Sequence, residues 1–439
     1  IPAANRPVRV RPSFITASPP SAQPQTIEPF KSAGWSEVRQ AFLNAVRRSV
    51  RCRHDPVATW PVAAVPTIDV SDLVSGTDPD AARAVGMRIV TACEDPGFFQ
   101  IIGHGVDVDL RTQLERAARE FFALDATEKR HIAMVHGGTA WRGWFPLGDE
   151  LTAGAPDGKE GLYFGIELPP DDDRVAAGVA LHGANLYPDR PAALTALVPR
   201  WIDAVTAVGR AVLRGISLGV GGDDTAFDEW CADPTVLFRI FHYPAVASPE
   251  QPEQPSTAVQ ADQSTGATPR WGVGEHTDYG LLTLLAQDHT GGLQVLTGRS
   301  DSTERRWVDV APVPDAFVCN LGDMLERVSG GRFVATAHRV VAPSTDRISM
   351  PLFRDPGWGV ELAPIRALNR PRPHDAPPGT VGNADGRTLG GIAADERTER
   401  WDGEDVHAVN GPYSEYLLSR VARVFPDLFA AVQEESTGV

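Results

Sequence analysis

The segment GEHTDYGLLTLLAQ (Gly274–Gln287) places a histidine and an aspartate two residues apart, directly before an apolar run. Side chains at positions i and i+2 of a β-strand point to the same face, so the pattern predicts that His276 and Asp278 project together while Thr277 points away. The apolar run is predicted to continue the same strand into the core. A metal site explains this arrangement, and so does the polar start of an ordinary strand, because two ligands alone hold a metal weakly.

A third ligand favours the metal site. His338 lies 62 residues beyond His276, in the strand-like run ATAHRVV. Two histidines and one carboxylate form the facial triad of non-haem Fe(II) enzymes, which leaves coordination positions open for O₂ and a cosubstrate. The sequence therefore predicts that His276, Asp278 and His338 bind one metal ion, and no catalytic side chain beyond these ligands is predicted.

The segment DRISMPLF indicates a binding site for an organic acid beside this metal. Arg347 and Ser349 are two residues apart, and Arg347 follows His338 by nine residues. A guanidinium binds a carboxylate through two parallel hydrogen bonds, and a serine hydroxyl adds a further one. The phenol of Tyr243, in FRIFHYP, is predicted to reach the same carboxylate.

The composition excludes several other classes of function. The 439 residues carry a net charge of −16, which disfavours a nucleic-acid-binding protein because that function needs a basic surface. No apolar run reaches the roughly 18 residues of a membrane helix, so we expect no membrane partner. The four cysteines are far apart, which favours free thiols in a reducing cytoplasm over a disulfide framework. The HExxH and phosphate-loop motifs are absent.

The chain is predicted to divide into an N-terminal extension, a helical region, a β-rich core, a polar insert and a closing helical segment. The extension is rich in Pro and Ser and has no periodic apolar face, so we expect it to be disordered or loosely attached. The boundaries, in the same order, are 1–60, 61–230, 231–362 (with a Pro-rich insert at 247–270), 363–400 and 401–439.

Patterns of apolar residues predict a mainly β fold with flanking helices. After Pro234, short runs such as LLTLLAQ, GGLQVLT and AFVCNLG are separated by turn residues, which is typical of a β-sandwich or jelly roll. Before that point, an amphipathic segment ends at Asp95-Pro96-Gly97, and another runs from about Pro191 to Leu218.

From about Val65 to Phe429, outside the two inserts, the sequence resembles the isopenicillin N synthase-like family of Fe(II)/2-oxoglutarate-dependent dioxygenases. The resemblance is carried by GFFQIIGHGV, FHYP, HTDYGLLTLL, GGLQVL, NLGDMLERVSGGRFVATAHRVV and RISMPLF, in the family's order. It implies a double-stranded β-helix (jelly-roll) core. It also implies that Fe(II) is held by His276, Asp278 and His338. The far carboxylate of 2-oxoglutarate would be held by Arg347, Ser349 and Tyr243.

The resemblance further implies the reaction. Oxidative decarboxylation of 2-oxoglutarate to succinate and CO₂ would be coupled, with O₂, to hydroxylation or a related C–H oxidation of a small-molecule substrate. The N-terminal half of such proteins supplies part of the substrate pocket, which makes Arg142 and Tyr163 candidate substrate residues. An apolar wall around the site is expected from Leu282, Leu284, Leu293 and Phe353, and Phe353 is a further candidate substrate residue.

Two other functions fit the same residues. One is a same-fold Fe(II) oxidase that uses no 2-oxoglutarate, as isopenicillin N synthase and the ethylene-forming oxidase of plants do. The other is a non-catalytic ligand-binding protein that retains the fold. The sequence specifies neither the substrate nor the oligomeric state.

Overall fold

A computed structural model of the chain describes residues 65–246, 271–298, 305–368, 403–426 and 429–430. Three predicted segments lie outside the described residues: the N-terminal extension (1–60), the Pro-rich insert (247–270) and all but the start of the polar insert (363–400). The predicted domain boundaries stay predictions.

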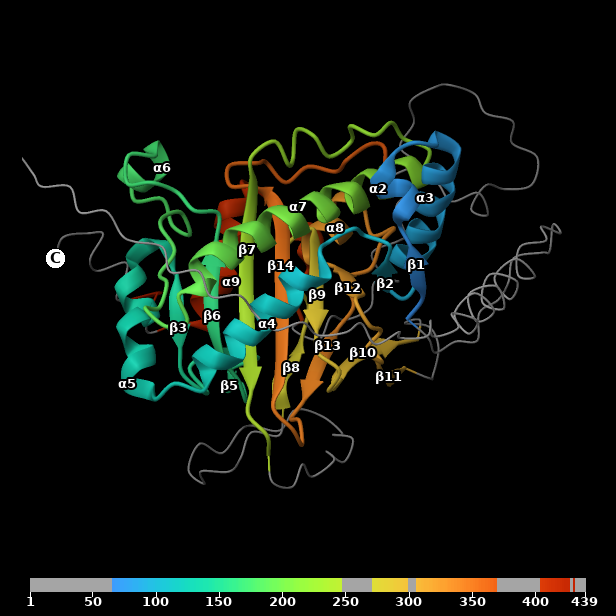
Figure 1. The fold of residues 1–439 in the computed structure, drawn as a ribbon. Coiled ribbons are helices and arrows are strands. Elements are labelled where there is room, and N and C mark those ends of the chain that lie inside the picture. Colours follow the sequence, from blue (N-terminus) through green and yellow to red (C-terminus); the bar gives the residue numbers. More distant parts are fainter. Residues whose placement is uncertain (1–64, 247–270, 299–304, 369–402, 427–428, 431–439) are drawn as a thin grey trace, which may run out of the picture. The chain divides into compact units, whose positions relative to one another are not determined.

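Eight strands, which pair with one another antiparallel, form the double-stranded β-helix and are shared between two sheets (Figure 1). Four of them form the middle of a large sheet in the order β12-β9-β14-β7, and the other four form a small sheet in the order β11-β10-β13-β8. The predicted jelly-roll core is therefore confirmed. The strands are β7 (Pro234–Tyr243), β8 (Trp271–His276), β9 (Leu282–Gln287), β10 (Leu293–Thr297), β11 (Arg306–Asp309), β12 (Phe317–Leu321), β13 (His338–Val341) and β14 (Arg347–Gly357).

Strands from the N-terminal half extend the large sheet on both sides. On one side β2 pairs with β12 and β1 pairs with β2, and on the other side β6 pairs with β7 and β3 pairs with β6. Strands β4 and β5 form a separate short hairpin, and β4 packs against β8 of the small sheet. These strands are β1 (Thr67–Asp69), β2 (Phe98–Ile102), β3 (Gly143–Phe145), β4 (Leu151–Thr152), β5 (Ala155–Pro156) and β6 (Glu160–Gly165).

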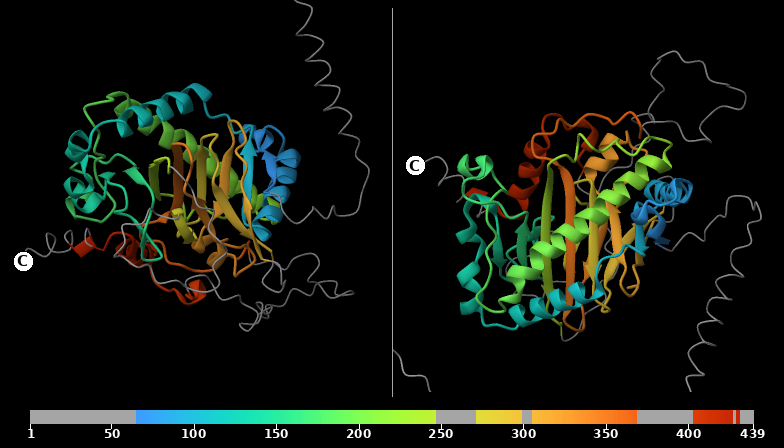
Figure 2. Two further views of the ribbon diagram at one scale, coloured as in Figure 1. Left: turned by 90° about the horizontal axis from the view of Figure 1, so that it is seen from below. Right: turned by 45° about the horizontal axis from the view of Figure 1, so that its top comes forward.

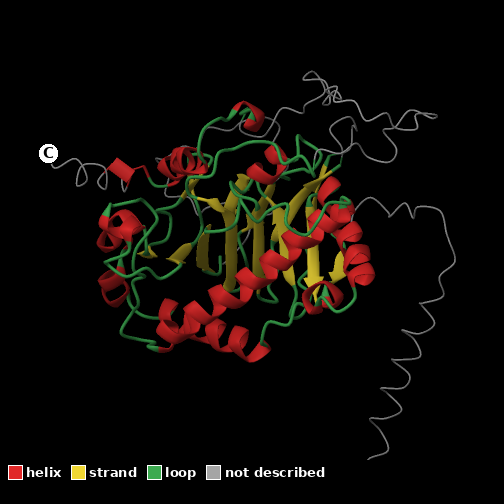
Figure 3. Ribbon diagram, turned by 90° about the horizontal axis from the view of Figure 1, so that it is seen from above, coloured by secondary structure: helices red, strands yellow, loops and turns green. Residues whose placement is uncertain are grey.

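The helices surround the strands, as the view from above shows (Figure 3). The predicted amphipathic segments form α3 and α7, and α7 lies across the outer face of the large sheet (Figure 2). The helices are α2 (Ser71–Ser75), α3 (Pro79–Glu94), α4 (Val108–Phe122), α5 (Ala126–Lys129), α6 (Asp173–Ala176), α7 (Ala193–Gly219), α8 (Asp323–Val328) and α9 (Tyr413–Val424), with 3₁₀ turns η1 (Arg130–Ile132), η2 (Met134–Ala140) and η4 (Val406–Ala408).

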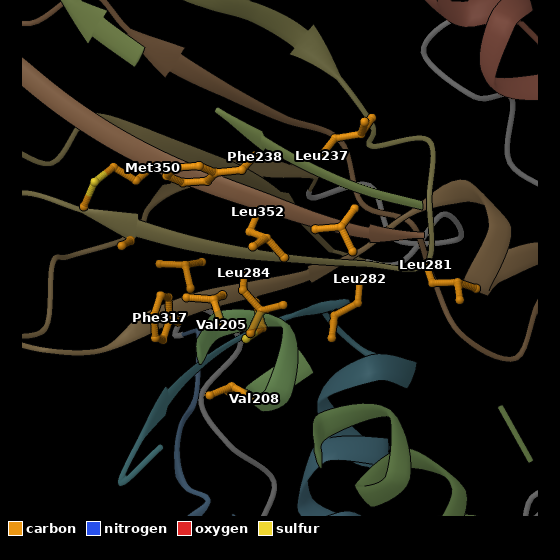
Figure 4. Packing of buried hydrophobic residues seen from close by; sticks show 14 of the residues in the cluster. Val205, Val208, Leu237, Phe238, Leu281, Leu282, Leu284, Phe317, Met350 and Leu352 are labelled. Atoms are coloured by element: carbon orange, nitrogen blue, oxygen red, sulfur yellow. The ribbon is translucent and has the colours of Figure 1, made fainter. Parts of the chain in front are cut away.

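The main core lies between α7 and the large sheet (Figure 4). Apolar residues at helical spacing on α7, among them Val205 and Val208, pack toward Leu284 of β9 and Leu352 of β14. Gly209 lets the helix approach closely, because a Cβ at that position would lie 3.1 Å from Leu284 Cδ1. Each strand thus places alternate residues in this core, and the residues between them face the interior of the jelly roll.

This alternation corrects one prediction about the apolar wall. Leu282 and Leu284 belong to the core face of β9, and the residues of this strand that line the interior cavity are Thr283 and Leu285. A shift of one residue along a strand reverses the face, and the sequence LLTLL does not reveal which phase is correct. The predicted wall residues Leu293 and Phe353 do line the cavity.

Candidate active site

The three predicted iron ligands meet where two strands of the small sheet lie side by side. Strand β8 ends at His276, strand β13 begins at His338, and these two residues are direct partners in the antiparallel register. Asp278 lies two residues beyond the end of β8. The ligand atoms of the three side chains all lie within 4.8 Å of one another, which is close enough for one metal ion.

The prediction that His276, Asp278 and the following apolar run share one strand is wrong. After His276 the chain leaves the small sheet, turns at Tyr279 and Gly280, and enters the large sheet as β9. A Cβ on Gly280 would lie 1.4 Å from Asp355 Oδ1, so only glycine fits in this crossing. The aspartate therefore reaches the metal position from a turn between the two sheets.

Hydrogen bonds orient both imidazoles toward the shared position. The Nδ1 atoms of His276 and His338 lie 2.8 and 3.1 Å from the carbonyl oxygens of Gly274 and Thr336, so each Nδ1–H donates to the backbone. The Nε2 atoms lie 3.8 and 3.7 Å from Asp278 Oδ1. Burial lowers the pKa of His276, and burial together with the nearby His276 lowers the pKa of His338 to about 4. Both rings are then neutral near pH 7, the form that binds a metal through Nε2.

Two neighbouring side chains hold the carboxylate of Asp278. Its Oδ2 accepts a hydrogen bond from Thr283 Oγ1 on β9 and another, of 2.6 Å, from Asn320 Nδ2 on β12. Burial alone raises the pKa of this carboxyl, but the two imidazoles and these hydrogen bonds outweigh it and lower the pKa. The second oxygen, Oδ1, remains directed at the imidazoles. The sequence did not identify Thr283 or Asn320, because they come from separate strands of the large sheet.

The predicted carboxylate site lies at the start of β14, where Arg347 is the first residue of the strand. Arg347 is fully buried, and its Nε donates to the carbonyl oxygen of Gly291 at 2.7 Å while its Nη2 donates to Gln287 Oε1 at 3.2 Å. The guanidinium lies over the Tyr243 ring, 4.7 Å from the ring centroid, and the Tyr243 hydroxyl is 3.3 Å from Ser349 Oγ. Its Nη1 has no acceptor among the described residues.

A cavity of about 640 Å³ extends over the iron ligands and the Arg347 site. The predicted substrate residues Tyr163 and Phe353 both line it. Helix α9 contributes part of the wall, including Leu417 and Phe425. The sequence did not identify the charged side chains that line the rest of the cavity, which are Glu150, Lys159, Arg239, Asp355, Arg420 and Arg423.

The structure does not support the predicted substrate role of Arg142. This side chain is buried but lies outside the cavity wall, which is reached instead by its neighbour Trp141. The Nη2 of Arg142 donates to the carbonyl oxygen of Leu181 at 2.8 Å, and the guanidinium packs against Gly165, where a Cβ would lie 2.1 Å from Nη2. Burial lowers the pKa of Arg142 to about 9.

The turn that carries Asp278 is linked to α9 through Asp323. The backbone N–H of Asp323 donates to the carbonyl oxygen of Asp278 at 2.7 Å, and its carboxylate accepts a 2.6 Å hydrogen bond from the Tyr416 hydroxyl. A second tyrosine of the helix, Tyr413, donates to Asp355 Oδ2 at 2.6 Å. Helix α9 is thus joined to the metal-site turn and to β14 by two buried hydrogen bonds.

Two sequence families match the regions that build this site. Residues 65–190 match the family described as non-haem dioxygenase in morphine synthesis N-terminal, and residues 234–356 match the 2OG-Fe(II) oxygenase superfamily. The chain belongs to the 2OG-Fe(II) oxygenase superfamily. This oxygenase is therefore a non-haem iron oxidoreductase that uses Fe(II), 2-oxoglutarate and O₂, and it couples the oxidative decarboxylation of 2-oxoglutarate to oxidation of a substrate.

Curated relatives agree with this membership. A probable iron/ascorbate oxidoreductase of Dictyostelium discoideum is 36% identical over 379 residues, which cover 84% of this chain and 96% of the relative. A homoarginine-6-hydroxylase of Arabidopsis thaliana is 34% identical, over 69% of this chain and 87% of the relative.

Solved structures share the fold of the oxygenase. A 2OG-Fe(II) oxygenase family protein from Caulobacter crescentus matches with a TM-score of 0.59 and 23% identity, covering 82% of this chain and 98% of that one. A full-length Neurospora crassa protein in complex with alpha-KG and 5-formyluracil matches with a TM-score of 0.61 and 24% identity, covering 84% of this chain and 99% of that one. Within the described ranges, none of the helices combines the length and apolarity needed to cross a membrane.

Proposed function

We propose that this oxygenase binds its iron through His276 Nε2, His338 Nε2 and Asp278 Oδ1. Two observations support these ligands: the Nδ1 atoms are occupied by backbone carbonyls, and Asp278 Oδ2 is occupied by Thr283 and Asn320. The three remaining donor atoms converge, and their types match the two-histidine, one-carboxylate set that non-haem Fe(II) prefers.

The cosubstrate site is assigned to Arg347, Ser349 and Tyr243, and one observation carries the assignment. A fully buried guanidinium with an unbonded Nη1 faces a cavity that also holds the iron ligands. A buried charge without a carboxylate is costly, and the far carboxylate of 2-oxoglutarate would remove that cost. The Ser349 and Tyr243 hydroxyls are close enough to bind the same carboxylate.

When bound, iron supplies the means to activate O₂ as 2-oxoglutarate is decarboxylated to succinate and CO₂, and so to oxidise a C–H bond of the substrate. The side chains of this protein determine where that oxidation occurs. Apolar residues such as Leu285, Leu293 and Phe353 exclude water from the cavity around the metal position. Thr283 and Asn320 keep Asp278 in one orientation, which fixes the position of the metal relative to the cavity.

The proposed substrate is a small molecule that undergoes hydroxylation or a related C–H oxidation. The cavity volume of about 640 Å³ is within the range of small-ligand sites. The relatives include 1-aminocyclopropane-1-carboxylate oxidases of two Dictyostelium species, each 31% identical over 83% of this chain, besides the homoarginine-6-hydroxylase. The substrates in these enzyme names are both amino acids, which supports a substrate of that class.

The function is tested by incubating the purified protein with Fe(II), O₂, 2-oxoglutarate and a panel of small amino acids and organic acids. We expect succinate and oxidised product in equal amounts. Product without succinate would indicate instead the same-fold oxidase that uses no 2-oxoglutarate. Tight binding of an organic acid with neither succinate nor product would indicate a non-catalytic binding protein.

We also propose a reducing compartment, the cytoplasm, for this oxygenase. Cys93 and Cys319 are buried free thiols, and Cys231 is free as well. Cell fractionation with an antibody against the full chain tests this location, and recovery in a secreted fraction would contradict it.

A further inference from the structure

Two buried guanidiniums line the cavity besides Arg347: Arg420, which pairs with Glu404, and Arg239. Arg239 lies on β7, is 5% exposed and belongs to the cavity wall. Its Nη1 donates to the carbonyl oxygens of Phe164 and Phe238, at 3.1 Å each. Among the described residues no carboxylate forms an ion pair with this guanidinium, and its Nε and Nη2 engage neither a carboxylate nor a backbone carbonyl.

The two acidic residues that act on Arg239 through their charge, Glu150 and Asp355, are engaged by other groups, Asp355 by the Tyr413 hydroxyl. Glu150 Oε1 accepts a 2.8 Å hydrogen bond from the Tyr163 hydroxyl, and Glu150 Oε2 lies 3.1 Å from Lys159 Nζ. Lys159 also pairs with Asp157 at 2.6 Å. Glu150 and Asp355 act on Arg239 through their charge, but among the described residues neither carboxylate forms an ion pair with it.

Arg239 and Arg347 are packed in the same way, each against the face of a tyrosine ring. Each guanidinium lies over a tyrosine ring, with Arg239 3.4 Å from the Tyr163 centroid and Arg347 4.7 Å from the Tyr243 centroid. A ring face fixes the plane of a guanidinium and leaves its edge free for a planar anion. The cavity therefore contains two carboxylate-binding geometries where 2-oxoglutarate requires one.

The strand register places the backbones of the two arginines at different positions along β7. Arg239 and Tyr243 are four residues apart on the inner face of β7, a separation of roughly 13 Å along the strand. Tyr243 pairs with Arg347, whereas Arg239 pairs with Tyr163. Arg239 is thus left for a different ligand at the end of the cavity away from the cosubstrate site.

We propose that Arg239 determines substrate specificity by binding the carboxylate of an organic-acid or amino-acid substrate. This inference rests on the proposed function, because it assigns Arg347 to 2-oxoglutarate. A monoanionic carboxylate matches one guanidinium, and the cavity wall also includes the apolar side chains Leu237, Phe241 and Phe353. These apolar neighbours accommodate the hydrocarbon part of the acid.

The test is a binding experiment on the full chain loaded with Mn(II), which prevents turnover, and saturated with 2-oxoglutarate. Small carboxylic acids are titrated by calorimetry, each beside its primary carboxamide, and homoarginine and 1-aminocyclopropane-1-carboxylate are included. We expect at least one acid to bind and its amide to bind about tenfold more weakly or worse. Equal binding of acids and amides, or binding of neutral compounds with no acid bound, would overturn the proposal.

Variants separate the role of Arg239 from that of the cosubstrate site. Arg239→Gln should weaken binding of the acid by about 10- to 150-fold, the effect of one charged hydrogen bond, and should bring the acid and amide affinities close together. Its affinity for 2-oxoglutarate should not change. Arg142→Gln is the matched control, since it removes a buried arginine outside the cavity and should preserve the difference between acid and amide.

Failure of this inference differs from failure of the proposed function. An Arg239→Gln protein that still prefers the acid sinks the inference while 2-oxoglutarate binding stands. A wild-type protein that does not bind 2-oxoglutarate sinks the proposed function instead. If Arg239→Gln does not fold, Arg239→Lys, which keeps the charge and removes the planar fork, takes its place, and an unchanged affinity for the acid in that variant would overturn the inference.

Discussion

Replacing Arg347 with glutamine perturbs the proposed cosubstrate site at the side chain that carries its charge. Two of the three guanidinium nitrogens are bonded within the protein, to Gly291 and Gln287, so Nη1 is the nitrogen left for a ligand. Loss of one charged hydrogen bond costs about 1.5–3 kcal/mol. We therefore expect 2-oxoglutarate to bind roughly 10- to 150-fold more weakly.

Ser349→Ala is the comparison variant at the same site, and we expect it to lose less affinity for 2-oxoglutarate than Arg347→Gln does. It removes a neutral hydroxyl, and a neutral hydrogen bond is worth about 0.5–1.5 kcal/mol, or roughly a 2- to 13-fold change in affinity. The arginine variant should therefore lose clearly more affinity than the serine variant. Tyr243→Phe removes a hydroxyl of the same kind and should resemble Ser349→Ala.

The assay is anaerobic calorimetric titration of the Fe(II)-loaded protein with 2-oxoglutarate, with thermal unfolding as the control for stability. Some destabilisation of the Arg347→Gln protein is expected, about 1–3 kcal/mol, because the buried carbonyl of Gly291 loses its donor. Wild-type affinity in the Arg347→Gln protein, or a larger loss in Ser349→Ala, would refute the assignment of this site.

Four further predictions concern the metal ligand Asp278, the hydrogen bond from Asn320 to that ligand, the core residue Leu284 and the pH dependence of stability. Asp278→Ala should abolish iron binding by metal analysis and retain the circular dichroism of the wild type; retained iron would contradict the ligand assignment. Asn320→Ala should weaken iron binding by about 10- to 100-fold because Asp278 loses a partner, and an unchanged affinity would argue against that positioning role. Leu284→Ala should cost about 2–5 kcal/mol in urea unfolding and leave 2-oxoglutarate affinity unchanged, since this side chain faces α7; a lost affinity would place it in the cavity. Burial raises the pKa of Asp355 to about 7, and an unfolded aspartate titrates near 3.9, so its contribution to stability should fall as the pH rises between about 4 and 7. Asp355→Asn should reduce that slope, and an unchanged slope would contradict the assignment.

Spacing rules identified the residues whose partners are near in sequence or share a strand. Arg347 and Ser349 occupy alternate positions of β14, and the same-face rule that paired them is correct. The same rule applied to β7 would also have pointed to Arg239, which lies four residues before Tyr243 in the run FRIFHY. The alternation of residues along β7 is therefore enough to place Arg239 on the cavity side of the strand.

Contacts between strands that are far apart in the sequence cannot be predicted from the spacing of residues within one strand. Asn320 bonds to Asp278 because β12 lies next to β9 in the large sheet, and nothing in the sequence around either residue specifies that order. The chain crossing at Gly280 was missed for a related reason. A His-x-Asp pair fits a strand and a strand end equally well, and the choice depends on the close approach of Asp355 from β14.

The assignment of Arg142 shows the limit of reasoning from charge. A positive side chain in the half of the chain that lines the cavity was a reasonable substrate contact, but its neighbour Trp141 faces the cavity instead. The backbone at Trp141 is left-handed, with a φ of 54°, which breaks the regular alternation that sequence reasoning assumes.

We propose that one iron ion and one 2-oxoglutarate share the cavity, the iron at His276, Asp278 and His338 and the 2-oxoglutarate at Arg347. A crystal structure of the protein grown anaerobically with Fe(II) and 2-oxoglutarate, with anomalous scattering to locate the iron, tests it most directly. We predict one iron bound by His276, Asp278 and His338, with the far carboxylate of 2-oxoglutarate on Arg347. Iron at any other position, or 2-oxoglutarate bound without contact to Arg347, would contradict the account.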